Sequence, residues 1–240
     1  MRKIRAALLV GLALSSAGAI QKKLKPWTEW SKKDAEKILN DSPWGQTQVV
    51  TDTTEMTYTP TSGSSRSPNA GERAQRGAVN QEVYLKYRIR FLSARPIRQG
   101  LARMIEIEQK TPDPALSDQL RGFVERSFDD YIVVAVVFES NDQRFAGPAM
   151  QEINSAVAGT LKNNTYLELS DGRRLFLMEY RAPINDGLGA KFVFTRKVDG
   201  KPFITANAGE VRFFTEVGAT VKLNQRFKIS DMMYDGKLEF

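Results

Sequence analysis

The sequence of 240 residues contains no cysteine and no histidine. Without cysteine, the chain has no disulfide, no thiol nucleophile and no lipid-modified cysteine anchor. Without histidine it has no imidazole general base, which excludes Ser-His-Asp and Cys-His catalysis. Zinc sites built from cysteine or histidine are excluded for the same reason. The chemistry that remains belongs to carboxylates, lysine, tyrosine, serine and metals bound through oxygen.

The sequence also lacks the short motifs that mark common active sites. It contains no P-loop, no G-x-G-x-x-G, no G-x-S-x-G, no S-x-x-K and no EF-hand loop. We therefore expect no cofactor and no metal site.

The N-terminus has the three parts of a secretory signal peptide. Basic residues open it, an apolar run covers residues 6–14, and small residues follow over 15–19. The apolar run is far shorter than the roughly 20 residues that cross a bilayer. We predict cleavage after Ala19, no transmembrane span afterwards, and export to the periplasm or the medium. The alternative is an uncleaved membrane anchor. Export without cysteine is typical of a bacterial envelope protein.

Composition and pattern divide the chain into four segments. A helix is predicted to start at Ser31, with Asp34 completing a capping box, and to end before Ser42-Pro43; a strand follows over 46–59. The predicted organisation is a signal peptide (1–19), an N-terminal arm with this short helix and strand (20–60), a flexible Gly/Ser/Arg loop (61–78) and a main α+β domain (79–240).

Within the arm, residues 30–44 read WSKKDAEKILNDSPW. This run resembles the opening of a group of uncharacterised secreted bacterial proteins, in which a tryptophan, a short helix and an S-P-W turn precede a strand. The group has no assigned activity, so the resemblance implies an exported setting and no mechanism.

The main domain alternates between helical and strand patterns. Strict alternation predicts a strand over 83–91, and an apolar run predicts a strand over 131–138 that is covered on both faces. Helices are predicted around 97–105, 116–124 and 148–161. After residue 164, Asp-Gly pairs at 171, 199 and 235 predict antiparallel hairpins. The expected fold class is α+β, a largely antiparallel sheet with about three amphipathic helices packed on it after an N-terminal helical arm.

Basic residues provide one candidate binding surface. The formal net charge is +7, and the part that lies outside the signal peptide is concentrated in residues 79–110. Lys86, Arg88 and Arg90 share one strand face, and Arg95, Arg98 and Arg103 follow it. Such a face can contact phosphates or anionic envelope polymers. The alternative is a solvated face paired with carboxylates such as Glu168 or Glu179. Nucleic acid is not expected, because the chain is exported and no aromatic residues interleave the cations.

The tryptophans provide a second candidate, since Trp27, Trp30 and Trp44 all lie close together near the start of the chain. They can form an aromatic platform for a sugar or a partner protein. The alternative is a hydrophobic clasp that fixes the arm to the sheet.

A third candidate is catalytic. Glu139 and Asp142 follow the buried strand and precede a helix, and two carboxylates can act as an acid/base pair, as in glycosidases. The alternative is an ordinary polar loop. We therefore expect an exported, non-catalytic binding protein whose partner is an envelope protein or an anionic polymer. The alternative function is a carboxylate-based hydrolase of envelope polymers.

Overall fold

The computed structural model describes residues 25–52, 83–109, 111 and 113–240. The predicted signal peptide (1–19), the predicted loop (61–78) and the end of the predicted strand over 46–59 lie outside the described residues.

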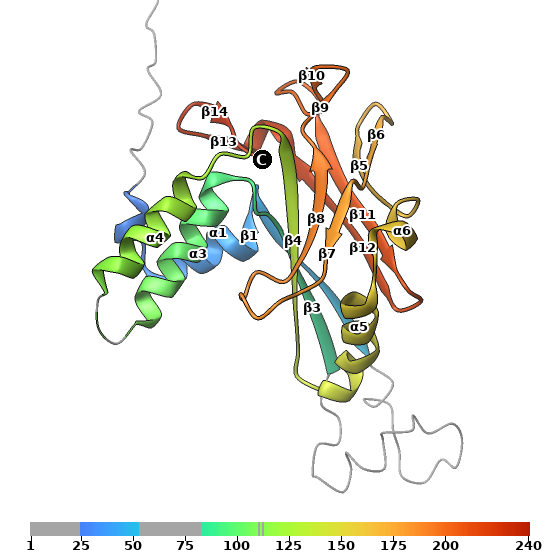
Figure 1. Cartoon of the computed structure of the whole chain (residues 1–240), viewed down its shortest axis with the longest axis horizontal. Coiled ribbons are helices and arrows are strands. Elements are labelled where there is room, and N and C mark those ends of the chain that lie inside the picture. Colours follow the sequence, from blue (N-terminus) through green and yellow to red (C-terminus); the bar gives the residue numbers. More distant parts are fainter. Residues whose placement is uncertain (1–24, 53–82, 110, 112) are drawn as a thin grey trace, which may run out of the picture.

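The fold is α+β, as predicted, and its sheets are antiparallel (Figure 1). The five α-helices among the described residues are α1 (Lys32–Asn40), α3 (Arg95–Glu108), α4 (Pro114–Glu125), α5 (Gln143–Ser155) and α6 (Ala158–Leu161). Short 3-10 turns are η1 (Trp27–Glu29) and η2 (Ile229–Asp231).

The strands form two main sheets. Sheet A has the order β1-β2-β3-β4-β8-β7, with β1 (Asp41–Ser42), β2 (Gly45–Asp52), β3 (Val83–Phe91), β4 (Tyr131–Ser140), β8 (Ala190–Thr195) and β7 (Glu179–Arg181). Sheet B has the order β12-β11-β5-β6, with β12 (Val221–Lys228), β11 (Glu210–Val217), β5 (Thr165–Leu169) and β6 (Arg174–Phe176). Two small hairpins complete the strands, β9 (Lys197–Val198) with β10 (Lys201–Pro202) and β13 (Met233–Tyr234) with β14 (Lys237–Leu238).

The two sheets pack face to face around the main core. Phe91 of β3 meets Phe227 of β12 edge-on at 4.9 Å between ring centroids, and Phe192 of β8 meets Phe213 of β11 at 5.3 Å. Such edge-to-face pairs stabilise a core beyond the area they bury. Helices α1, α3 and α4 lie on the other side of sheet A (Figure 1). Sheet A is therefore covered on both faces where the helices reach it.

The predicted capping box forms at the start of α1. The Ser31 hydroxyl accepts the Asp34 N–H at 3.2 Å, and the Asp34 carboxylate accepts the Ser31 N–H at 3.0 Å. The helix ends at Asn40, and the Ser42 hydroxyl donates to the Ile38 carbonyl at 2.6 Å. The local sequence thus determines both ends of this helix.

The third helix was predicted over 148–161, and those bounds are wrong. The helix begins at Gln143, because the Asp142 carboxylate caps it by accepting the Arg144 N–H at 2.8 Å. Pro148 therefore lies inside α5 rather than at its start. Extended backbone at Ala156 and Val157 then ends α5 and separates it from α6.

The strands after residue 164 also differ in part from their predicted bounds. The alternating segments after residue 164 predict strands over 226–230 and 201–206, among others. Instead, β12 spans Val221–Lys228 and pairs with β11 along its whole length, and the strand at 201 is reduced to Lys201–Pro202. Tertiary pairing, which the local pattern does not contain, decides these bounds.

Candidate ligand-binding site

The candidate basic face lies on the helix side of sheet A, but its three cations have different surroundings. Arg90 is 6% exposed, and its Nε donates to the Leu39 carbonyl at 3.0 Å while its Nη2 donates to the Asn40 side chain at 2.8 Å. Burial lowers the pKa of Arg90 to about 10, which leaves it charged at neutral pH. Arg90 therefore joins sheet A to the end of α1.

Arg88 and Lys86 lie beyond the helices and are partly exposed. Arg88 forms an ion pair with Glu139 on the neighbouring strand β4. The Lys86 ammonium lies 4.2 Å from the centroid of the Tyr84 ring. The structure thus brings one of the sequence-predicted binding residues against one of the predicted catalytic residues.

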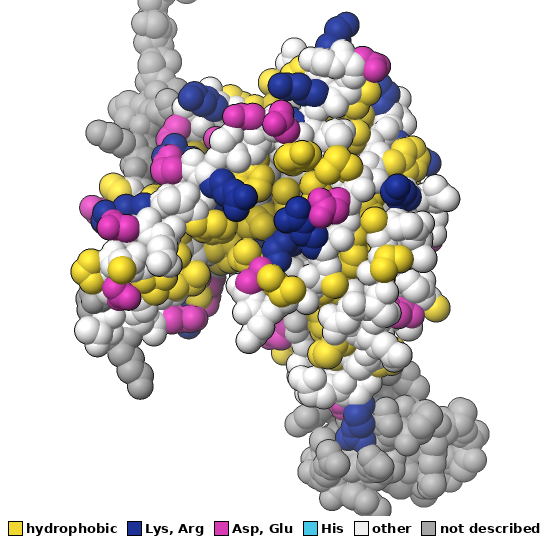
Figure 2. Space-filling model, viewed as in Figure 1, with side chains coloured by type: hydrophobic (Ala, Val, Ile, Leu, Met, Phe, Trp, Pro, Cys, Tyr) yellow, Lys and Arg dark blue, Asp and Glu magenta, His cyan; other side chains and the backbone are white. Residues whose placement is uncertain are grey.

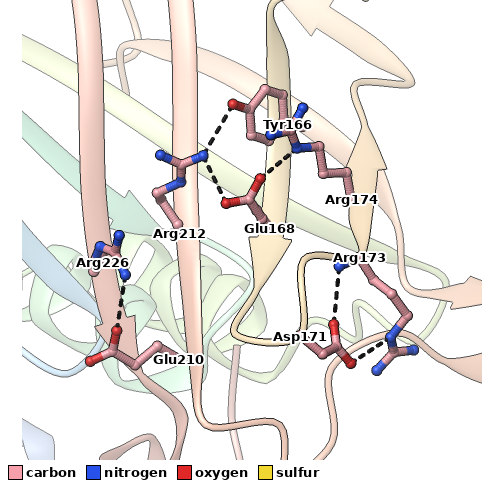
Figure 3. Close-up of polar contacts among 8 residues, drawn as sticks. All are labelled: Tyr166, Glu168, Asp171, Arg173, Arg174, Glu210, Arg212 and Arg226. Carbon is pink, nitrogen blue, oxygen red and sulfur yellow. Dashed lines mark hydrogen bonds and ion pairs between the residues drawn. The ribbon is translucent and has the colours of Figure 1, made fainter.

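The expected partners Glu168 and Glu179 do not pair with this face. Glu168 lies on sheet B, where it holds Arg174 of β6 and Arg212 of β11 (Figure 3). Glu179 pairs with Arg181 on its own strand, at 2.8 Å. Strand order explains the difference, because the neighbours of β3 are β2 and β4 and not β5 or β7.

The remaining cations of the basic segment, Arg95, Arg98 and Arg103, bind groups in and around the helices. Arg95 pairs with Glu125 at the end of α4, at 2.7 Å. Arg98 is 4% exposed and donates to main-chain carbonyls of α4 and of the turn before α3. Arg103 donates to the Trp30 carbonyl at 2.7 Å.

The three tryptophans occupy separate positions. Trp30 and Trp44 are each 6% exposed, and their indole N–H groups donate to the carbonyls of Lys25 and Glu239. Trp27 is half-buried and packs against a small cluster on α3 and α4. Trp44 also meets Tyr234 edge-on, at 5.8 Å. The indole rings of Trp30 and Trp44 face the protein interior.

Glu139 and Asp142 have distinct structural roles. Glu139 is exposed near the end of β4 and forms the Arg88 ion pair. Asp142 is the N-cap residue of α5. Neither residue lines the cavity described next.

A cavity of about 550 Å³ lies where the helices leave the helix side of sheet A uncovered, and we call it the apolar cavity. Its floor and one wall are apolar, formed by Leu92, Phe123, Phe128, Tyr131, Val133, Leu188 and Val193. Charged side chains surround this floor, namely Arg126, Asp129, Asp130, Glu179, Arg181, Asp186 and Lys191. Figure 2 shows the hydrophobic hollow between the helical layer and the sheets, with charged side chains of both signs around it.

Two ion pairs fix part of the charged rim. Arg181 holds Glu179, and its hydrogen bonds lower the pKa of that carboxyl. Lys191 holds Asp186 at 2.7 Å. Partial burial raises the pKa of Asp186, but the bonds from Lys191 and from the Leu188 N–H outweigh it, so the net pKa is lowered. Both carboxyls are therefore held in their charged form.

The segment from 183 to 189 places Leu188 at the cavity. Asp186 accepts the Leu188 N–H at 2.9 Å, which closes the turn. Gly189 then enters β8 with a φ of +76°, and a Cβ at that position would lie 2.2 Å from the Val136 carbonyl oxygen. Only glycine fits this close approach without strain.

Sequence analysis missed the apolar cavity, because its residues come from four separate segments of the chain. No local signal marked the cavity, because Val133 and Val193 are buried like their neighbours in two apolar runs. Strand alternation alone does not reveal where a covering helix stops.

Comparisons of the chain with protein-family models, with curated proteins and with solved structures find no match. In the described part of the chain, no helix has the length and apolar character needed to cross a bilayer. No group of three or more acidic side chains is placed to hold a metal ion among the same residues.

Proposed function

We propose that this chain is an exported, non-catalytic binding protein of the bacterial envelope, and that it holds an amphipathic ligand in the apolar cavity. The observation that carries the proposal is the cavity whose apolar floor is formed by Leu92, Val133 and Val193, next to the end of α4. Concave apolar sites with a few placed polar groups are the usual form of a ligand pocket. The signal-like N-terminus supports export.

The rim supports a ligand that has an apolar body and a polar end. Burial of apolar surface would supply affinity at about 25 cal/mol per Å². Arg181 and Lys191 are already paired with carboxylates, so the rim would orient the polar end of the ligand whether that end is positive, negative or neutral. The apolar lining would therefore supply the affinity, and the charged rim the orientation.

The alternative function, a carboxylate-based hydrolase, has less support. A general acid of that class needs a carboxyl whose pKa is raised. The pKa values of Glu179 and Asp186 are lowered instead. Glu139 is held by Arg88, and Asp142 caps a helix.

Export can be tested with the full chain produced in a Gram-negative bacterium. We expect signal peptidase to cleave after Ala19, so that the mature protein begins at Ile20 and is released with the periplasmic or extracellular fraction. Intact mass and N-terminal sequencing of each fraction measure this. Replacing Leu8 and Leu9 with arginine should keep the chain in the cytoplasm. An unprocessed wild-type chain in the cytoplasm would refute the export part of the proposal.

Ligand capture can be tested with a neutral apolar fluorescent probe, N-phenyl-1-naphthylamine. The substitution Leu188→Gln puts an amide at the apolar wall and is expected to weaken probe binding about tenfold, because a buried amide without a partner loses roughly 1–3 kcal/mol. Titration of probe fluorescence measures the affinity.

The matched control is Ile184→Gln on the same segment. Ile184 is 68% exposed and does not line the apolar cavity, so probe affinity should stay unchanged. Equal loss in both variants, or no probe binding to the wild type, would contradict the proposed site. Envelope extracts that displace the probe from the wild type can then be fractionated to identify the natural ligand.

A further inference from the structure

A second cavity, of about 280 Å³, shares residues 126–129 with the apolar cavity, and we call it the arginine cavity. Four arginines line it, from four different parts of the chain: Arg95, Arg98, Arg126 and Arg196. They converge where α3 begins, where α4 ends and where the chain leaves β8.

Arg98 is the most buried of the four, with 4% of its surface exposed. Its Nε donates to the Val124 carbonyl at 3.1 Å and its Nη1 to the carbonyls of Leu92 and Ser93. Its guanidinium lies 4.9 Å from the Phe128 ring. Among the described residues, Nη2 has no hydrogen-bond partner. Arg98 is therefore held rigidly by main-chain carbonyls, while its Nη2 is accessible to solvent and free to bind a ligand.

Arg95 leaves a second donor unused. Its Nη2 is paired with Glu125, but its Nε is buried and has no hydrogen-bond partner among the described residues. Leaving a buried donor unpaired costs free energy, so such donors are rare unless they face a ligand or a water. Two rigid, unfilled N–H groups thus belong to residues of one small polar cavity.

The donors left free around the cavity favour an anion. Three carboxylates, from Glu125, Asp129 and Glu239, line the cavity with the four guanidinium groups, and Arg196 is occupied by the main-chain oxygens of Phe128 and Phe240. Glu125 is occupied by Arg95, and Glu239 accepts the Arg95 main-chain N–H at 3.1 Å. Burial lowers the pKa of Arg98 to about 10, and the charges of Glu239 and Glu125 offset only part of this effect.

We propose that the arginine cavity binds a phosphate-type oxyanion through the unused N–H groups of Arg98 and Arg95, with the exposed Arg126 as a further cation in the lining. Planar guanidinium groups present paired donors that match the oxygens of phosphate. The anion is either free phosphate or the phosphate of a larger molecule such as a lipid headgroup. This inference does not rest on the proposed function, although the two cavities share residues 126–129.

Isothermal titration of the purified protein with inorganic phosphate tests the inference. Arg126 is exposed and makes no polar contact with another described residue, so Arg126→Gln should preserve the fold while weakening phosphate affinity about tenfold. Asp129→Asn removes a repelling charge and should strengthen affinity about threefold. If these residues had only a structural role, one substitution would not weaken phosphate affinity while the other strengthened it.

The matched control is Arg121→Gln, an exposed arginine on α4 that does not line the cavity. Its phosphate affinity should equal that of the wild type, and so should that of Leu188→Gln, which alters only the apolar cavity. Thermal denaturation of each variant confirms that it is folded.

Vesicles distinguish the two sources of phosphate. Binding to phosphatidylglycerol vesicles that Arg126→Gln abolishes, with no response to free phosphate, assigns a lipid headgroup. Binding of free phosphate with no response to vesicles assigns the free anion. The inference is overturned if the wild type binds neither, or if Arg126→Gln and Arg121→Gln lose affinity equally.

Discussion

Replacing Arg90 with alanine is expected to reduce the free energy of unfolding by about 3–4 kcal/mol, among the largest effects of any single substitution. Arg90 supplies the hydrogen bonds to the Leu39 carbonyl and the Asn40 side chain at the end of α1. Alanine leaves these buried acceptors unpaired, at about 1–3 kcal/mol, and leaves a cavity where the arginine side chain lay. Urea denaturation followed by tryptophan fluorescence measures the loss.

The control is Arg88→Ala, two residues away on the same face of β3. Arg88 contacts Glu139 at the surface, and exposed ion pairs contribute only about 0–1 kcal/mol. We therefore expect a change of at most about 1 kcal/mol. If both substitutions cost the same, the packing of α1 against sheet A is not as described.

Gly189→Ala is expected to destabilise the protein by about 2–4 kcal/mol and to reshape the apolar cavity. Two costs add. The backbone has a φ of +76°, which alanine adopts only with strain, and the new Cβ would lie 2.2 Å from the Val136 carbonyl oxygen. Because that oxygen belongs to β4, the start of β8 must move away from it. Thermal denaturation measures the stability, and probe titration measures the cavity.

The control is Gly187→Ala on the same segment. Its φ is +71°, but a Cβ there meets nothing within 4 Å, so only the conformational cost of about 1–2 kcal/mol applies. Probe affinity should also be kept better in Gly187→Ala than in Gly189→Ala. The opposite order would show that the close approach of Gly189 to β4 does not determine the shape of the cavity.

Much of the secondary structure followed from local signals. The capping box of Ser31 and Asp34, the alternation over Val83–Phe91 and the apolar run from Tyr131 each predicted an element that the structure contains. These signals are reliable because each arises from residues that are close together in the sequence. None of them depends on contact with a distant part of the chain. The pairs Asp199-Gly200 and Asp235-Gly236 form hairpins, with positive φ at both residues of each pair.

Local signals failed where two of them competed. Pro148 predicts a helix start, yet the cap at Asp142 lies further upstream and Pro148 lies inside α5. Helical spacing over 148–161 predicts Val157 on the apolar stripe of that helix, but Val157 is 57% exposed beyond the end of α5. A capping residue fixes the start of a helix through a hydrogen bond. Proline, by contrast, is only tolerated in the first turn and does not fix where the helix begins.

The sequence by itself determined what chemistry is missing, because the absence of cysteine and histidine excludes thiol and imidazole catalysis in any fold. It also determined the fold class, since periodicity and turn residues act locally. Only the tertiary structure decided which cations of the basic segment are buried and which are exposed. Alternation placed Arg88 and Arg90 on one face, but burial depends on where α1 crosses that face. In the same way, Arg95, Arg98, Arg126 and Arg196 form one cavity only because the chain folds back on itself, a long-range fact that no local pattern encodes.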